Sequence, residues 1–217
     1  MLIFFAKLIR MIYFYKKEKP NIIMKKLLLI TLLIIPFCGF SQTTTPIDGF
    51  LGIKFGSSKQ AVIAAIRAKG GVLEKNAPGP LGLAFDKVKL GNRQCAAFVV
   101  KFIDDKAFCA VFSFEPKEQP KTIDYYNSLV SDLSEKYGPG KPTADFKEPF
   151  KLGDGNEILA IQGGYVAMYT DWDSNDHSIQ ASIDHDGDGL SVTLIYTDEK
   201  LQAIVDAKQK AKQNSDM

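Results

Sequence analysis

The chain has 217 residues and carries 27 Lys and Arg against 25 Asp and Glu, a formal net charge of +2. These charges are unevenly placed, since residues 1–41 contain seven of the bases and a single acid, Glu18. The other 176 residues hold 20 bases and 24 acids, a net charge of −4, so no basic surface for a nucleic acid is expected. This length is sufficient for one ordinary domain or two small ones, with a hydrophobic core that needs no disulfides to support it.

The N-terminal region is predicted to direct export. Residues 24–41 begin with lysines, continue with an apolar run that is short for a membrane span, and end in a small residue, Ser41. This order is typical of a secretory signal peptide, so we expect cleavage after Ser41 and membrane contact only through the uncleaved signal. The protein should then work in the periplasm, at the outer membrane or outside the cell. Pro36 and Phe37 precede Cys38 where a lipoprotein box needs small residues, so lipidation is not expected.

Residues 1–23, upstream of this signal, are interpreted as the result of a misassigned start codon. The alternative is a membrane-anchoring extension. Residues 42–47 are expected to form a polar linker to the folded domain.

The domain is expected to begin with one helix and three strands. Ser57 and Gln60 form a capping-box pattern, and the apolar spacing after them predicts a helix that stops at Gly70. Strands are predicted over residues 81–90, 94–103 and 107–114. An odd-length turn between the last two strands would align one apolar face that consists of Phe98, Val100, Phe102, Phe108, Ala110, Phe112 and Phe114.

The rest of the domain follows a similar order. Apolar residues at spacings of three and four predict a helix over residues 122–137, which Gly138 ends. Strands are expected near residues 157–162, 165–171, 177–185 and 190–197, before a final amphipathic helix over residues 197–213. This order predicts an α+β fold, a single domain over 48–213 with helices on one face of antiparallel sheet. It also admits a helix-plus-sheet unit used twice, in halves 48–118 and 119–213.

Two short motifs carry a resemblance to known proteins. A G-x-S-x-x-x-V pattern opens the first helix (Gly56, Ser58, Val62), and an L-x-x-K-Y-G pattern with a later proline ends the second (Leu133, Lys136, Tyr137, Gly138, Pro142). The chain thereby resembles small exported bacterial proteins of unassigned function. In layout it is similar to the SmpA/OmlA outer-membrane lipoproteins and the β-lactamase inhibitory protein, although Pro139 and Gly140 depart from the simple pattern. The resemblance implies a non-enzymatic binding or envelope role.

Cys95 and Cys109 are not expected to form a disulfide. If the two predicted strands pair so that Phe102 faces Phe108, Cys109 lies opposite Lys101, roughly 20 Å along the strand from Cys95. The Cα atoms of a disulfide must lie within about 7 Å of each other.

Enzyme motifs do not match the sequence. FGSSKQ lacks the G-x-S-x-G pattern of a nucleophile elbow, and GPGKPT lacks the pattern of a phosphate-binding loop. His177 and His185 should lie about 26 Å apart on one strand, too far to share a metal ion or a proton. Trp172 is interpreted as a packing residue rather than a platform for a sugar or base. We therefore expect no catalytic residues and no cofactor, and a pocket that joins Glu157 with Asp145 would indicate an enzyme instead.

Acidic residues dominate residues 152–199, which contain ten acids and no Lys or Arg. Two clusters, at 171–176 and 184–189, flank one predicted strand, so they should lie at its opposite ends. They indicate either a site for a cation or basic partner, or Asp residues that serve turn geometry. We favour turn geometry.

The second cluster is the better candidate for a metal, because Asp184, Asp186 and Asp188 match the start of a calcium-binding loop. The twelfth position of that loop should be a Glu, and here it is Ile195. A β-hairpin explains the run as well, with apolar pairs on one face: His185 with Leu190, Ile183 with Val192, Ala181 with Leu194, and Ile179 with Tyr196. We therefore expect a hairpin loop without a metal ion.

The sequence thus predicts an exported, non-catalytic protein that binds another protein or an envelope component. One alternative is a calcium-binding module that uses Asp184, Asp186 and Asp188, and another is an enzyme of unrecognised type.

Overall fold

A computed structural model describes residues 45–75, 82–185 and 189–215 of the chain. The predicted signal peptide (24–41), the extension before it and the first half of the linker (42–44) lie outside the described residues. The end of the linker is already bound to the domain, since Thr45 N donates to Lys136 O at 3.0 Å and Ile47 is buried.

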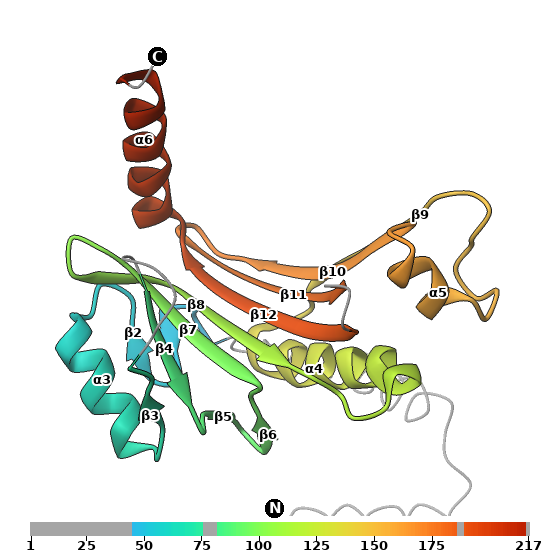
Figure 1. Ribbon diagram of the computed structural model, residues 1–217, viewed down its shortest axis with the longest axis horizontal. Helices are drawn as coiled ribbons and strands as arrows, with labels where there is room; N and C mark the ends of the chain where they lie inside the picture. The colour runs from blue at the N-terminus through green and yellow to red at the C-terminus, as the bar shows by residue number, and fades with distance from the viewer. Residues whose placement is uncertain (1–44, 76–81, 186–188, 216–217) are drawn as a thin grey trace, which may run out of the picture. The chain divides into compact units, whose positions relative to one another are not determined.

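The domain is built on one antiparallel sheet of eight strands (Figure 1). Their order across the sheet is β3 (Val72–Leu73), β4 (Gly82–Asp86), β7 (Ala97–Ile103), β8 (Lys106–Phe114), β12 (Leu190–Asp198), β11 (His177–His185), β10 (Val166–Asp173) and β9 (Lys141–Phe146). Two small hairpins accompany it, β1 (Gly49–Phe50) with β2 (Ile53–Lys54), and β5 (Lys89–Leu90) with β6 (Arg93–Gln94). The helices are α3 (Lys59–Ala68), α4 (Thr122–Tyr137), α5 (Glu157–Gln162) and α6 (Glu199–Ser215), with a 3-10 turn η1 (Gln119–Lys121). The predicted α+β class is confirmed.

The two halves of the chain contribute the same series of elements. In each half a helix precedes four strands of the sheet, and these strands run in sequence from an outer edge to the centre. The first half ends with β8 and the second with β12, and these two strands pair so that Phe112 lies opposite Leu194. The topology agrees with the interpretation of one helix-plus-sheet unit used twice.

The main hydrophobic core lies between one face of the sheet and the helices α3 and α4. Phe98 is fully buried at its centre, with its ring centroid 4.5 Å from that of Phe112. From α3 the core receives Val62 and Ile66. From α4 it receives Tyr126, Leu129 and Leu133.

Helix α3 begins one residue later than its capping-box pattern predicts. The N-cap is Ser58, whose hydroxyl accepts a hydrogen bond from Ala61 N at 3.3 Å, rather than Ser57. Ser57 is occupied elsewhere, because its carbonyl accepts from Ala107 N at 2.9 Å and so joins the segment before the helix to β8.

A β-bulge changes the predicted pairing of β7 with β8. Lys101 pairs with Cys109 as expected, but the register shifts between Lys101 and Phe102, so that Phe102 faces Ala107. The turn has two residues, Asp104 and Asp105, both with positive φ (49° and 60°), as a tight hairpin turn requires. The prediction that Phe108 shares the face of Phe98 is therefore wrong.

Phe108 instead belongs to a small cluster on the second face of the sheet. There it is buried with Cys109 and with Val205 of α6. The first turns of α6 thus cover this face, while α3 and α4 cover the other.

Both cysteines are free and buried, as predicted. Burial raises the pKa of the Cys95 thiol to about 11 and also raises that of Cys109. Neither thiol is a reactive nucleophile near neutral pH, because the thiolate is the reactive form.

The predicted strands differ from the structure in three places. The strand predicted over residues 81–90 is interrupted after β4, where Lys87 has a positive φ of 59°. Residues 157–162 form helix α5 instead of a strand. The edge strand β9 was not predicted. The register predicted for β11 and β12 is confirmed at all four pairs: His185 with Leu190, Ile183 with Val192, Ala181 with Leu194, and Ile179 with Tyr196.

Candidate functional site

Residues 147–165, which connect β9 to β10, form an excursion that we call the arm (Figure 1). Its helix, α5, lies against β10 and β11 and buries Ala160 and Ile161. The helix ends at Gly163, and Gly164 then adopts a φ of +69°, a left-handed conformation that favours glycine. The chain can therefore turn back into β10 within a few residues.

Hydrogen bonds from side chains to the backbone shape the loop before α5. Asp154 Oδ2 accepts from Lys151 N at 3.0 Å, and Asp154 Oδ1 accepts from Asn156 N at 2.8 Å. Glu157 Oε1 accepts from Gly153 N at 2.7 Å. The backbone donors, Asn156 N before Lys151 N, lower the pKa of the Asp154 carboxyl. The two acids therefore define the conformation of the loop.

The arm holds three large hydrophobic side chains in solvent. Leu152 is 71% exposed, Leu159 is 58% exposed and Tyr165 is 41% exposed. The ring of Tyr165 also packs on that of Phe150, with 5.1 Å between their centroids. Single exposed hydrophobic residues are ordinary, and it is their number on one short excursion that makes the arm a candidate interaction site.

The arm is close to neutral, with two lysines and three acids (Lys147, Lys151, Glu148, Asp154 and Glu157). From residue 152 to residue 199 the sequence contains no Lys or Arg, so the arm leads into a region of acidic character.

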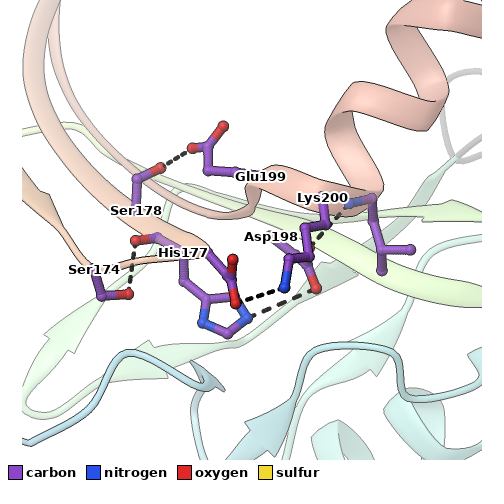
Figure 2. Close-up of polar contacts among 8 residues, drawn as sticks. Ser174, His177, Ser178, Asp198, Glu199 and Lys200 are labelled. Carbon is purple, nitrogen blue, oxygen red and sulfur yellow. Dashed lines mark hydrogen bonds and ion pairs between the residues drawn. The ribbon is translucent and has the colours of Figure 1, made fainter.

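A second polar cluster lies where α6 meets the β10–β11 turn (Figure 2). The ring of His177 stacks on Phe55 at 4.9 Å, and its Nε2 lies 3.7 Å from Asp198 Oδ2. Ser174 Oγ donates to the His177 carbonyl at 3.0 Å, and Ser178 Oγ donates to Glu199. Both serine hydroxyls are thus engaged away from the imidazole, so this geometry is not that of a Ser–His–Asp catalytic site.

The same cluster has a structural role at the start of α6. Asp198 Oδ1 accepts from Leu201 N at 3.0 Å, as an N-cap residue does. Glu199 N donates to Asp176 O at 2.9 Å, and Lys200 Nζ lies 2.8 Å from Asp176 Oδ2. These contacts fix the first turn of the helix to the sheet.

A hollow of about 440 Å³ opens beside the β1–β2 hairpin, with Tyr137 and Tyr196 among its lining residues. Burial, and next the neighbouring Tyr137, raise the pKa of Tyr196 above its ordinary value. Lysines at the ends of α3 and α4 also line it, in positions that the helix dipole favours without any ligand. The third lysine, Lys54, lies 3.9 Å from Asp48. The arm is therefore the stronger candidate.

The acids of the 171–176 cluster are engaged in contacts within the domain. Asp171 Oδ1 accepts from Gln180 Nε2 at 2.9 Å, Asp173 pairs with Lys141 at 2.8 Å, and Asp176 pairs with Lys200. Within the described residues, no group of three or more His, Cys, Asp or Glu side chains could hold a metal ion. Of the calcium alternative, Asp184 is exposed at the end of β11, while Asp186 and Asp188 lie outside the described residues.

The structure separates the other residues that the sequence singled out. His177 and His185 stand at opposite ends of β11. Trp172 is 4% exposed and donates from Nε1 to Gly138 O at 2.9 Å, so it is a packing residue. Glu157 caps the loop of the arm, whereas Asp145 lies on β9.

Sequence reasoning missed the arm because EILAIQ, at residues 157–162, is too short to show a helical period and reads as a strand. One signal was present: GDGN at residues 153–156 is a strong turn sequence directly before an apolar segment.

No known family matches the sequence, and comparison with curated proteins and with solved structures gave no match either. The resemblance to exported envelope proteins therefore stays a prediction. Among the helices of the described residues, none has the length and apolar character needed to cross a membrane.

Proposed function

We propose that this is an exported, non-catalytic binding protein that holds a partner protein through its arm. The main support is a combination of two observations on the arm: its loop is held by hydrogen bonds, and its side chains Leu152, Leu159 and Tyr165 are exposed to solvent. A preorganised apolar surface loses little conformational entropy on binding, so its burial contributes more fully to affinity. Export rests on the signal-like sequence at residues 24–41.

A protein suits the arm better than a lipid surface does. Membrane-surface segments combine apolar residues with many lysines and arginines that attract anionic lipids. The arm has two lysines against three acids, and residues 152–199 have no Lys or Arg. The partner surface should therefore be apolar, with basic residues around it.

Site-specific crosslinking tests the proposal. A photoreactive phenylalanine analogue at Leu159 would be crosslinked in the envelope fraction, and the captured protein would then be purified and its affinity measured. We expect Leu152→Asp and Leu159→Asp to weaken that affinity at least tenfold, because each places a charge in an apolar contact. Val72→Asp and Ile204→Asp are matched controls, since these residues are 47% and 44% exposed elsewhere in the domain.

Two outcomes would contradict the proposal. If the control substitutions weaken the affinity as much as the arm substitutions do, or if the arm substitutions leave it unchanged, the arm is not part of the interface. Binding to anionic phospholipid vesicles that is lost with Leu159→Asp would replace the protein partner with a membrane.

A further inference from the structure

Strand β9 has no neighbour on its outer side among the described residues, so it is an open edge of the sheet. Helix α5 does not close this edge, because it lies against β10 and β11. Lys141, Pro142, Ala144 and Asp145 are all exposed. The opposite edge of the sheet is formed by β3, which has only two residues.

The hydrogen bonds of the β9–β10 ladder show which backbone groups face outward. Lys147 N donates to Tyr165 O at 2.7 Å, in register with the pairs that follow along β10. Since inward and outward groups alternate along an antiparallel strand, the backbone groups of Pro142, Ala144 and Phe146 face away from β10. Pro142 therefore occupies a position where the missing N–H costs the β9–β10 ladder nothing.

The sequence of this edge is complementary to itself. In an antiparallel pair of two copies centred on Thr143, Ala144 N would donate to the carbonyl of Pro142 of the partner subunit. Phe146 N would donate to the Gly140 carbonyl of the partner subunit, and the two-fold symmetry repeats both bonds from the other copy, although Pro142 has no N–H to donate in return. Lys141, which also pairs with Asp173 of its own chain, would then face Asp145 of the partner subunit on both sides of the axis, a cross-strand pair of opposite charges.

The neighbouring registers are each worse. Pairing centred on Ala144 places Lys141 against Lys147 of the partner subunit, and pairing centred on Asp145 places two like charges in contact. Pairing centred on Pro142 sets two prolines opposite each other, where neither has an N–H to donate. A lysine and a proline commonly protect an open edge from pairing, and of these four registers only the one centred on Thr143 avoids both a like-charge pair and a pair of prolines.

We infer that β9 pairs with β9 of a second copy in this register and joins the two sheets into one. This surface is separate from the arm, so the inference does not depend on the proposed function. The dimer would carry two arms.

Sedimentation of the purified domain from residue 42 onward tests the association. We expect a concentration-dependent dimer that Ala144→Pro abolishes, because the substitution removes outward donors and leaves the inward ladder intact. Asp145→Lys should raise the dimer dissociation constant about tenfold or more, since it sets two pairs of lysines in opposition. The matched control is Glu135→Lys, the same charge change at an exposed position of α4.

Disulfide trapping tests the register without relying on stability. Thr143→Cys should form a disulfide dimer under mild oxidation, because directly opposed residues of a non-hydrogen-bonded pair have Cα atoms about 4.5 Å apart. Asp145→Cys should not, because its two copies would be roughly 13 Å apart at the strand rise. The native thiols, Cys95 and Cys109, are buried, so the unmodified protein should give no band.

A monomer at every concentration would overturn the inference, and so would a dimer that survives Ala144→Pro. Equal trapping of Thr143→Cys and Asp145→Cys would overturn the register. If Leu159→Asp dissociates the dimer, the contact involves the arm rather than the edge.

Discussion

The two halves of this domain have the same order of elements but differ in what they contribute to the protein. The first half buries its aromatic rings, since Phe50, Phe85, Phe98, Phe112 and Phe114 are each at most 2% exposed. The second half buries fewer aromatic residues (Tyr126, Trp172 and Tyr196) beside a mainly aliphatic core. It also contains both buried polar residues of the described chain (Thr122 and Thr170), and it leaves the arm and β9 open. One half thus supplies the larger part of the aromatic core, while the other presents the surfaces available for contact.

The largest expected effect tests whether the halves are one folding unit. Phe98→Ala should lower the free energy of unfolding by about 3 to 5 kcal/mol, because it empties a fully buried ring site. Denaturant unfolding followed by Trp172 fluorescence and by far-UV circular dichroism should show one shifted transition, since β8 and β12 share the sheet. Phe150→Ala, on the arm, is the control with a small expected effect. Two separate transitions would show that the halves unfold independently.

A glycine in each half sharpens the comparison of packing. A Cβ on Gly140 would lie 2.5 Å from Thr170 Cγ2 and 2.7 Å from Trp172 Cε2, whereas on Gly82 the nearest atom would be 3.4 Å away. Gly140→Ala should therefore cost about 1 to 3 kcal/mol, as overpacking does, and Gly82→Ala much less. Thermal melts of the two variants decide this, and equal melting temperatures would contradict the packing argument.

The buried polar pair of the second half should also be measurable. Tyr126 Oη and Thr170 Oγ1 lie 2.6 Å apart in the core. Tyr126→Phe should cost about 1 to 2 kcal/mol because it leaves the threonine hydroxyl without a partner. In a double-mutant cycle, Thr170→Val should recover part of this loss. Full additivity of the two losses would mean that the hydroxyls are not coupled.

The other buried threonine should respond in the opposite direction. Thr122 Oγ1 is buried and has no hydrogen-bond partner within the described residues. Thr122→Val keeps the shape and removes the unsatisfied hydroxyl, so it should stabilise the domain by about 1 kcal/mol. Thr197→Val, at a partly buried threonine on β12, is the comparison, with little gain expected. Destabilisation by Thr122→Val would show that the hydroxyl has a partner, such as a water molecule.

The smallest effect concerns the pH dependence of the arm. The pKa of Asp154 is lower in the folded protein than in the unfolded chain. Its contribution to the stability of the loop is therefore fully present above about pH 4, where an ordinary Asp is ionised. It is lost as the pH falls through the lowered pKa. Amide exchange of residues 151–156 should accelerate there relative to α4, and Asp154→Ala should show this acceleration already at neutral pH. Unchanged amide exchange in the Asp154→Ala variant would show that the carboxylate does not stabilise the conformation of the loop.

Sequence periodicity predicted the parts of the fold where one pattern is sufficient. The β11–β12 register follows from apolar alternation, and α4 follows from its regular spacing, so both are confirmed. Tertiary contacts decided the rest. A β-bulge places Phe108 on the other face of the sheet. Ser58, rather than Ser57, is the N-cap of α3, because the carbonyl of Ser57 accepts a hydrogen bond from β8.

The candidate site was the least predictable part, for a physical reason. Leu152 and Leu159 matter because they are exposed to solvent. The sequence shows that a residue is leucine, but it does not show whether that leucine is exposed or buried. The partners of β9 are likewise set by the topology, since β10 pairs with it only after the arm returns.

Trp172 is the single tryptophan of the chain, and its place gives the protein an optical reporter of its own. Trp172 lies on β10, the strand that pairs with β9. Its indole is buried against the end of α4, where Nε1 donates a hydrogen bond to Gly138 O. Its emission should be shifted to the blue, and it should move to the red when α4 or β10 loosens. Binding at the arm, association at the edge and unfolding of the domain can therefore be followed by intrinsic fluorescence, without any label.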